Sequence, residues 1–423
     1  MTAPAKPKPL SIRENMLWNS AGSLSYLICQ WLITVLVVRL SDGFDAAGLL
    51  SLATSVVGTF GTFANYKMGT YQISDIHHEN RLSEYLAFRC VTLSIAGVAC
   101  VVYALVTCPL YSVVTIVLYY VYKGVGLVID ILHGCDQQNR RMDYIGKSFM
   151  LQGATSIGSF VAAFLLTQNL NLAIVAMTVC VLCVFALYDC RRARQFEPLG
   201  ISISREKALR LLRTSLPAVI ASVAASAIFT VPKQYLLAVS GDAALGIYSS
   251  IAAPALVVQM GAQYLYGPLL DIFPRRFFDG RMSDFNKLLA KTTLSIIAVA
   301  VCCCVGLLFL GEPLLVIVFG ESIRPHVYLL QPVLISTVMT AFLWFFGDLL
   351  ITVRDFRANF TGNVLALAAV LPLSFVCVNL WDMNGVSFAS AGACLVGVAY
   401  LGYALRKDAK RQLASEREDS HEH

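Results

Sequence analysis

Runs of about 20 apolar residues recur along the whole chain, and this feature constrains the fold more than any other. A helix of about 20 apolar residues can cross the ~30 Å hydrocarbon core of a bilayer. Because lipid offers no partners for backbone polar groups, such spans must be helical. Only 14% of the residues are charged, against about 25% in soluble domains. The sequence therefore predicts an all-α integral membrane protein.

Twelve runs qualify as spans. They lie at residues 16–38, 46–66, 85–107, 112–133, 147–167, 171–190, 215–238, 245–269, 291–311, 327–350, 358–378 and 386–405. The least regular part is 306–330, where Pro313 and Pro325 interrupt the apolar run around 312–325. Because proline interrupts helical hydrogen bonding, Leu314 to Phe319 are a candidate interfacial or re-entrant segment.

The distribution of basic residues predicts the orientation of the spans. Cytoplasmic loops of membrane proteins are enriched in Lys and Arg. With the N-terminus in the cytoplasm, 28 of the 32 Lys and Arg residues fall in cytoplasmic segments, and Arg89 is one of these 28. The other four are Arg39, Lys123, Lys233 and Arg324. A miscounted span would invert every later loop and destroy this separation. We therefore predict that both termini are cytoplasmic.

The longest predicted cytoplasmic connection divides the spans into two groups of six. It contains a basic amphipathic stretch, Arg205 to Arg213, suited to the membrane surface. Gly48 and Ser51 in the second span recur as Gly246 and Ser249 in the eighth, which indicates an internal repeat. Repeats related by an even number of spans share one orientation, as in transporters with two lobes. The expected organisation is an N-terminal segment 1–15, an N-lobe 16–190, a linker 191–214, a C-lobe 215–405 and a charged tail 406–423, with two pseudo-symmetric six-helix lobes around a central cavity.

A few charges lie within the predicted spans, where they tend to face cavities and partners. Lys123 lies near the middle of the fourth span, and Asp130 follows on the same face about 10 Å away. Arg39 and Lys233 lie near the outer ends of the first and seventh spans. If the three cations share one cavity, they favour an anionic solute such as a phosphate ester. Alternatively, Lys123 and Asp130 have structural partners on other helices, and the two outer cations snorkel to the surface.

Other polar residues are weaker candidates. Asp130 and Asp348 are candidates for coupling or gating, although Asp348 also fits an interface residue satisfied by Arg354 or water. The histidines fall in predicted loops, span ends or the tail. Candidate sugar contacts, each of which also fits ordinary packing, are Asn19, Tyr26, Asn65, Tyr66, Tyr119, Tyr122 and Gln259.

The chain lacks the common motifs of nucleotide, metal and hydrolytic sites. It contains no G-x-x-x-x-G-K-[ST], H-E-x-x-H or G-x-S-x-G, and its 13 cysteines include a single C-x-x-C pair, Cys180 and Cys183, which lies inside an apolar span. We therefore expect no metal, no organic cofactor, no nucleic-acid partner and no enzymatic activity.

Several phrases resemble the bacterial polysaccharide flippases of the Wzx-like type. These are Ala64 to Ile76, the stretch from Tyr122 through Lys123 and Asp130 to Ser148, Pro232 to Tyr235, and Gly385 to Ala391. The likeness covers residues 13–405, and it implies membership of the multidrug/oligosaccharidyl-lipid/polysaccharide exporter superfamily. It also implies two six-helix lobes in a bacterial inner (plasma) membrane and a cationic cavity lined by Arg39, Lys123 and Lys233. Undecaprenyl-diphosphate-linked sugars would be the cargo.

The resemblance also implies that an ion gradient, of H⁺ or Na⁺, drives transport. Drug-exporting relatives often carry an acid in the first span, and this sequence has none there, so the coupling ion stays open. The leading hypothesis is a monomeric flippase of lipid-linked oligosaccharides that works beside glycosyltransferases and a glycan polymerase. A multidrug exporter would need an acid-lined cavity for cationic drugs, whereas this sequence offers three cations. A glycan polymerase or ligase would need a long outer loop, whereas every predicted outer loop here is short. A major-facilitator carrier and a non-transporting scaffold are further alternatives.

Overall fold

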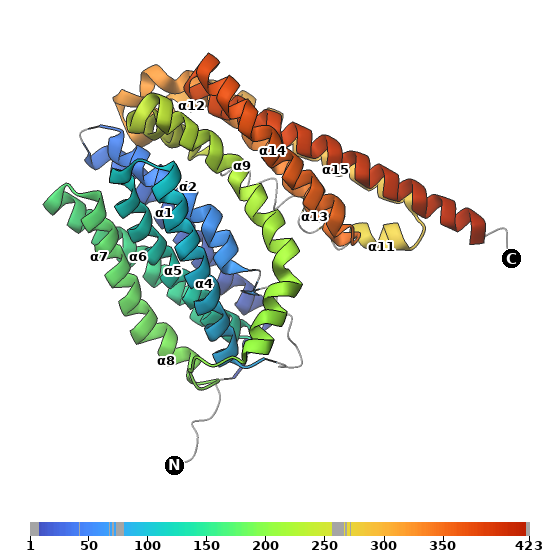
Figure 1. Ribbon diagram of the computed structural model, residues 1–423, viewed down its shortest axis with the longest axis horizontal. Helices are drawn as coiled ribbons and strands as arrows, with labels where there is room; N and C mark the ends of the chain where they lie inside the picture. The colour runs from blue at the N-terminus through green and yellow to red at the C-terminus, as the bar shows by residue number, and fades with distance from the viewer. Residues whose placement is uncertain are drawn as a thin grey trace, which may run out of the picture. The chain divides into compact units, whose positions relative to one another are not determined.

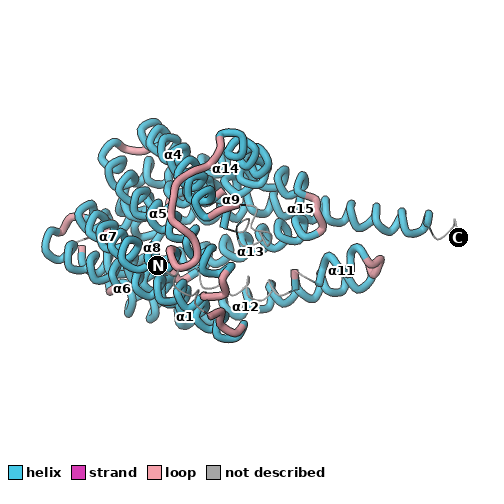
Figure 2. The backbone as a smooth tube through the Cα atoms, turned by 90° about the horizontal axis from the view of Figure 1, so that it is seen from below, coloured by secondary structure: helices cyan, strands magenta, loops and turns pink. Residues whose placement is uncertain are grey.

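The computed structural model describes residues 8–41, 43–66, 68–69, 72, 80–255, 266, 269–270 and 272–419. All regular elements in this part of the chain are helices, joined mostly by short loops (Figure 2), so the all-α prediction is confirmed. Eleven of the described helices are long and apolar enough to cross a membrane. The remaining predicted span, 245–269, lies partly outside the described residues.

The chain divides into two compact units, Met1–Val219 and Ile220–His423. In the first unit, α1 packs along α6, α6 along α7, and α2 against α4 and α5 (Figure 1). Its elements are α1 (Ile12–Leu40), α2 (Asp45–Asn65), α4 (Leu82–Thr107), α5 (Leu110–Gln138), α6 (Met142–Thr167), α7 (Leu170–Val184), the π-helix η1 (Phe185–Asp189), α8 (Cys190–Ala193) and the beginning of α9 (Arg205–Ala252).

Local signals in the sequence set the ends of these helices. Ser11 and Glu14 form a capping box at the start of α1, in which each side chain satisfies a backbone N–H of the first turn. The Asn169 side chain accepts hydrogen bonds from two backbone N–H groups at the start of α7. Pro109 directly precedes α5, where its missing N–H leaves no helical hydrogen bond unmade.

Glycines allow α1 and α6 to approach closely. A Cβ atom on Gly22 would collide with the backbone of Gly146, and one on Gly146 would collide with the carbonyl group of Trp18. Small residues at such crossings bring helix backbones together in membranes, where dispersion contacts replace the hydrophobic effect as the main source of association. The α1–α6 pair is therefore a tightly packed part of the first unit.

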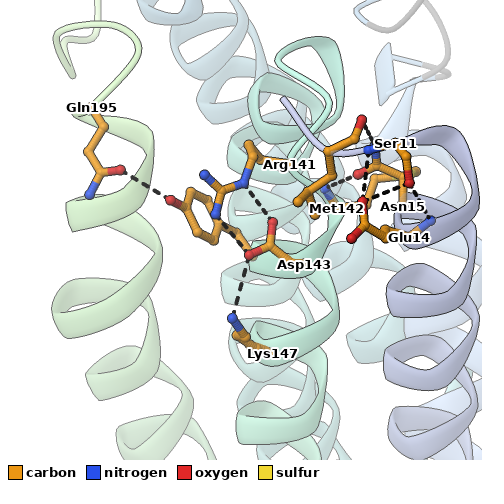
Figure 3. A network of polar contacts seen from close by, with 10 residues as sticks. Ser11, Glu14, Asn15, Arg141, Met142, Asp143, Lys147 and Gln195 are labelled. Carbon is orange, nitrogen blue, oxygen red and sulfur yellow. Dashed lines mark hydrogen bonds and ion pairs between the residues drawn. The ribbon is translucent and has the colours of Figure 1, made fainter. Parts of the chain in front are cut away.

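Polar contacts fix the start of α1 to the turn between α5 and α6 (Figure 3). The Met142 N–H donates to Asn15 Oδ1 at 2.8 Å, and the Leu10 N–H donates to the Arg140 carbonyl oxygen at 3.0 Å. The Asn15 side chain also donates to the Leu10 carbonyl oxygen at 3.2 Å. The first two of these bonds join segments that are far apart in the sequence.

Asp143 is the centre of a second group of contacts in the same view (Figure 3). Arg141 donates to both of its carboxylate oxygens, at 2.8 and 2.9 Å, and Lys147 donates at 3.5 Å. The hydrogen bonds to Asp143 raise the pKa of the Arg141 guanidinium above its ordinary value. Asp143 therefore has two cationic partners of its own.

In the second unit, α14 packs along α15, and α13 also contacts α15. Aromatic rings dominate its core, with Phe273, Phe285 and Phe345 all fully buried. Gly241 interrupts α9 with a φ of 84°, a conformation that glycine adopts readily. Besides the rest of α9, the elements are α11 (Ile272–Phe278), α12 (Met282–Phe319), the 3₁₀ helix η3 (Glu321–Leu329), α13 (Leu330–Thr352), α14 (Phe356–Trp381) and α15 (Met383–Asp419).

The structure corrects the prediction of a re-entrant segment. Leu314 to Phe319 continue α12, which runs unbroken from Met282 through Pro313. A proline removes one hydrogen bond, and neighbouring groups in a membrane protein can compensate for it. The basic stretch Arg205 to Arg213 is likewise the first part of the long helix α9. Its Lys207 ammonium forms an ion pair with Glu84 of α4 at 2.8 Å.

Candidate functional site

A cavity of about 310 Å³ lies inside the first unit, with walls from α1, α2, α5 and α6. We refer to it as the Lys123 cavity. Its lining mixes apolar and glycine positions with polar side chains, including Thr54, His133 and Gln152. Five residues predicted from the sequence also line it: Tyr26, Asn65, Tyr119, Lys123 and Asp130. The structure thus places in one cavity residues from three helices that the sequence identified only as separate candidates.

Aromatic rings surround the Lys123 ammonium. Its Nζ lies 5.8 Å from the ring centre of Tyr119 and 5.7 Å from that of Tyr122, within the range of cation–π attraction. The side chain is half-buried. Within the described part of the chain, Lys123 makes no salt bridge. The cavity therefore presents a cation that aromatic faces position and that no carboxylate of the described residues neutralises.

Tyr122 connects α5 to α1 and α6 next to the cavity. Its hydroxyl accepts a hydrogen bond from Gln30 Nε2 at 2.9 Å and lies 3.2 Å from Ser156 Oγ. The side chain is buried, with 3% of its surface exposed. These contacts orient the Tyr122 ring beside Lys123, and Tyr122 is not among the residues that line the cavity.

Asp130 is paired with an arginine from another helix. Arg89 Nη2 of α4 lies 3.6 Å from Asp130 Oδ2, with 0% of the arginine side chain exposed and 46% of the aspartate side chain exposed. The same guanidinium donates to the Ala64 carbonyl oxygen at 2.7 Å and to Asn65 Oδ1 at 3.0 Å. Arg89 therefore ties the end of α2 to α5 directly beneath the cavity wall.

The structure gives Arg89 a role that the sequence did not indicate. We predicted it in a cytoplasmic segment because it lies near the end of a span, and the positive-inside argument groups all such cations together. In the structure, it lies two turns inside α4 and is fully buried. The signal was present in the sequence, since an arginine within a predicted span needs an internal partner.

We expect Arg89→Gln to destabilise the first unit by about 2 kcal/mol, because it leaves Asp130 without its partner and shortens the contact to α2. Thr92 Oγ1 also donates to the Ala64 carbonyl oxygen, at 2.8 Å, which limits the loss. Thermal unfolding of the purified protein in detergent measures the effect, with the exposed Arg281→Gln as the matched control. Equal melting temperatures for the two variants would contradict the structural role of Arg89.

Three predicted residues lie elsewhere in the first unit. Arg39 is exposed in the last turn of α1, where a cation is favoured by the helix dipole. Asn19 is half-buried in α1, and neither residue is among those that line the Lys123 cavity. Tyr66 is 1% exposed, and its hydroxyl donates to the Leu212 carbonyl oxygen at 2.7 Å. That contact fixes the beginning of α9, and Tyr66 is not among the residues that line the Lys123 cavity.

The remaining predicted residues belong to the second unit. Lys233 is half-buried in α9. Asp348 of α13 accepts a hydrogen bond at 3.1 Å from the hydroxyl of Tyr266, a fully buried residue, which gives Asp348 a structural partner. Gln259 lies outside the described residues. Of the three predicted cavity cations, Lys123 alone lines the cavity in the first unit.

Sequence reasoning missed several residues of the cavity. His133 was assigned to a span end, but α5 continues to Gln138 and carries His133 into the cavity wall. Phe149 of α6 packs edge-on against the His133 ring, with ring centres 4.9 Å apart. Gly58 and Gly61 of α2 also line the cavity, and a Cβ atom at either position would meet no atom within 4 Å. Their lack of side chains leaves that space open.

Comparison with known proteins identifies the family. The model of the family described as "polysaccharide biosynthesis protein" matches residues 12–270. The capsular polysaccharide biosynthesis protein CapF of Staphylococcus aureus is 22% identical over 380 residues, which cover 88% of this chain and 94% of that protein.

Solved structures of transporters share the fold. The lipid II flippase MurJ, in an inward closed conformation, has a TM-score of 0.72 at 10% identity, with 94% of this chain and 90% of that chain covered. A mutant of the Vibrio cholerae MATE transporter VcmN has a TM-score of 0.61 at 12% identity, with 95% and 96% covered. The chain therefore belongs to the polysaccharide biosynthesis protein family, and it is a multi-pass membrane protein with the fold of transporters of the MOP superfamily.

Proposed function

We propose that this protein is a flippase that moves polyprenyl-diphosphate-linked oligosaccharides from the inner to the outer leaflet of a bacterial cytoplasmic membrane, for the synthesis of cell-surface polysaccharide. The observation that carries the proposal is the half-buried Lys123 ammonium in a cavity of the first unit. The family of the chain and the names of CapF and MurJ support the same class of substrate.

The charges of the cavity favour an anion. A cation at membrane depth is costly unless a partner of opposite charge compensates it. Lys123 has no carboxylate partner in the described residues, while Asp130 is paired with Arg89. Lys and Arg are common partners of phosphate groups. A diphosphate beside Lys123 would supply the compensation that this side chain lacks.

The same charges weigh against a multidrug exporter of cationic compounds, which is the second candidate. Such a compound would need a carboxylate that is free to bind it. Asp130 is the one acidic residue among those that line the described Lys123 cavity, and Arg89 already neutralises it. A cationic drug would therefore meet Lys123 without an available counter-charge.

The cavity has groups suited to a sugar next to the diphosphate. Tyr26 and Tyr119 offer aromatic surfaces, and Gln152 offers an amide. Its volume of about 310 Å³ is at the lower end of the range for small-molecule sites. We therefore assign to it the diphosphate and the first sugar, with the remaining sugars outside this cavity and the polyprenyl chain in lipid.

The transport cycle we propose is alternating access, in which rocking of the two repeats exposes the head group first inside and then outside. No covalent bond of the substrate changes, so the protein acts as a transporter and not as an enzyme. Glycosyltransferases would supply the lipid-linked sugar and a glycan polymerase would consume it. Arg39 and Lys233 stay candidates for further contacts with the head group along the route.

Binding of simple lipids to the purified full-length chain tests the proposal. We expect undecaprenyl diphosphate to bind at least about tenfold more tightly than undecaprenol, since a charge-assisted hydrogen bond contributes about 1.5–3 kcal/mol. In Lys123→Met, the preference should disappear while binding of the alcohol is unchanged. Equal binding of the two lipids to the wild-type chain would refute the proposal. Competition by a lipophilic cation but not by diphosphate would favour the multidrug alternative.

A further inference from the structure

A π-helical segment brings a buried acid to the wall of the Lys123 cavity. η1 (Phe185–Asp189) interrupts the helical path between α7 and α8, and Asp189 is its last residue. Short π-helical insertions occur frequently at functional sites, because they redirect side chains that a regular helix would place elsewhere. Here the Asp189 carboxylate points toward α5, where Oδ1 lies 3.5 Å from His133 Nε2.

A second acid lies close by on α5. Asp136 follows His133 by three residues, so both side chains lie on the same face of the helix. Asp136 and Asp189 are each 2% exposed, and His133 is 5% exposed. Asp136 also interacts electrostatically with Asp189. Two buried carboxylates and one imidazole thus share a small volume behind the cavity.

The hydrogen-bonding capacity of this group is incomplete. Asp136 Oδ1, Asp189 Oδ2 and His133 Nε2 are buried and have no hydrogen-bond partner among the described residues. Within the same part of the chain, neither carboxylate makes a salt bridge with Lys or Arg. Burial of an ionised carboxylate without a partner is so unfavourable that the group binds a proton instead.

The charged neighbours of Asp136 and Asp189 do not replace a proton as the partner of these carboxylates. Arg141 and Arg192 act on Asp136 from a distance, and Asp143 acts with the opposite sign. The Arg141 guanidinium is bound to Asp143 at 2.8 Å. The Arg192 guanidinium lies over the rings of Tyr144 and Tyr188, at 4.8 and 5.3 Å from their centres. Both cations are thus held by other groups.

We propose that His133, Asp136 and Asp189 form a proton-binding site that exchanges protons with the Lys123 cavity through His133. His133 both lines the cavity and contacts Asp189, so it connects the two. A hydronium ion in the cavity gives its proton to the neutral imidazole, which forms imidazolium and water. The imidazolium then gives the proton on Nε2 to Oδ1 of the ionised Asp189, which leaves a neutral imidazole and a neutral carboxyl group.

The composition of the site favours a proton over a sodium ion. Alkali and alkaline-earth cations prefer oxygen ligands, whereas a histidine nitrogen beside a carboxylate is suited to sharing a proton. Sodium binding is nevertheless a distinct outcome of the test below.

Protonation of His133 would change the charge of the cavity that holds Lys123. An imidazolium at this position adds a positive charge to the lining, which strengthens the hold on an anionic head group. Transfer of the proton to Asp189 removes that charge and weakens the hold. The coupling of this proton to export rests on the proposed function, whereas the existence of the proton site does not.

Infrared difference spectroscopy of the full-length protein in lipid tests the site directly. Between acidic and alkaline pH, we expect the wild-type protein to lose a carbonyl band of a buried, protonated carboxyl group. Labelling with [4-¹³C]aspartate should shift this band, which assigns it in the unmodified protein even if a variant fails to fold. Asp136→Asn or Asp189→Asn should remove the band, and Asp284→Asn, which alters an exposed carboxylate of α12, should keep it.

Three results would overturn the proposal: no pH-dependent carboxyl band in the wild-type protein, a band that both Asp136→Asn and Asp189→Asn retain, or the same spectral change on adding sodium at constant pH. The function is tested separately, by export in Lys123→Ala. A negative infrared result with export lost in Lys123→Ala rejects the proton site alone. A positive infrared result with undiminished export in that variant rejects the proposed function alone.

Discussion

Replacement of Lys123 by alanine is expected to abolish export of lipid-linked glycan and to cause the lipid-linked intermediate to accumulate on the cytoplasmic side. The substitution removes the one Lys or Arg side chain among the residues that line the Lys123 cavity. This side chain has no carboxylate partner among the described residues. Loss of one charge-assisted hydrogen bond corresponds to at least about a tenfold loss of affinity. Complementation of a flippase-deficient strain, with quantification of the intermediate, measures the effect.

Two control variants separate the charge from other effects of the substitution. Lys123→Arg keeps the cation and should retain part of the activity. Lys287→Ala removes an exposed lysine of α12 and should export like the wild type. The amount of each variant in the membrane must match. Undiminished export in Lys123→Ala at equal abundance would exclude this lysine from the transport route.

Gly61→Leu is expected to block export while the protein remains folded. Gly61 lines the Lys123 cavity, and a Cβ atom there would meet no atom within 4 Å. A leucine therefore extends into the space that we assign to the head group. Leucine also has a higher helix propensity than glycine, by up to about 1 kcal/mol. The variant should melt no lower than the wild type and yet fail in complementation.

Gly158→Leu is the matched control for this experiment. Gly158 is an exposed glycine of α6, a Cβ atom there would also meet no atom within 4 Å, and it is not among the residues that line the cavity. We expect normal export from it. Normal export from Gly61→Leu would show that the cavity is not on the route. Equal loss in both variants would indicate a general effect of added bulk on the helices.

The helices could be predicted from the sequence because their signal is long and strong. Eleven of the twelve predicted spans correspond to described helices of sufficient length, since about 20 apolar residues in succession have few other stable arrangements. The ends were less predictable. Hydropathy marks where a helix leaves the lipid but not where it stops, so α5 runs beyond the predicted 112–133 and α12 runs through Pro313.

The site could be predicted only in part, because residue type does not determine which way a side chain faces. Lys123 and Asp130 were found because charges are rare within spans, and both line the cavity. Tyrosines carry no such signal. Tyr26 and Tyr119 line the cavity, whereas Tyr66 and Tyr122 are buried and bonded to other parts of the first unit.

Arg89 and His133 were missed for a different reason. Both lie near a predicted span boundary, and an error of a few residues decides whether such a group belongs to a loop or to the membrane interior. Only the packing of α4 against α2 and α5 shows that Arg89 is buried against Asp130. Likewise, only the π-helical segment places Asp189 beside His133.

Transbilayer movement in a reconstituted system tests the central claim most directly. Vesicles containing the purified full-length protein would carry a fluorescent undecaprenyl-diphosphate-linked sugar in one leaflet, and a membrane-impermeant quencher would report its arrival in the other. We predict that wild-type protein accelerates the movement and that Lys123→Ala, at the same density, leaves it at the rate of protein-free vesicles. Equal rates for the wild type and for protein-free vesicles, or for the wild type and Lys123→Ala, would contradict the claim.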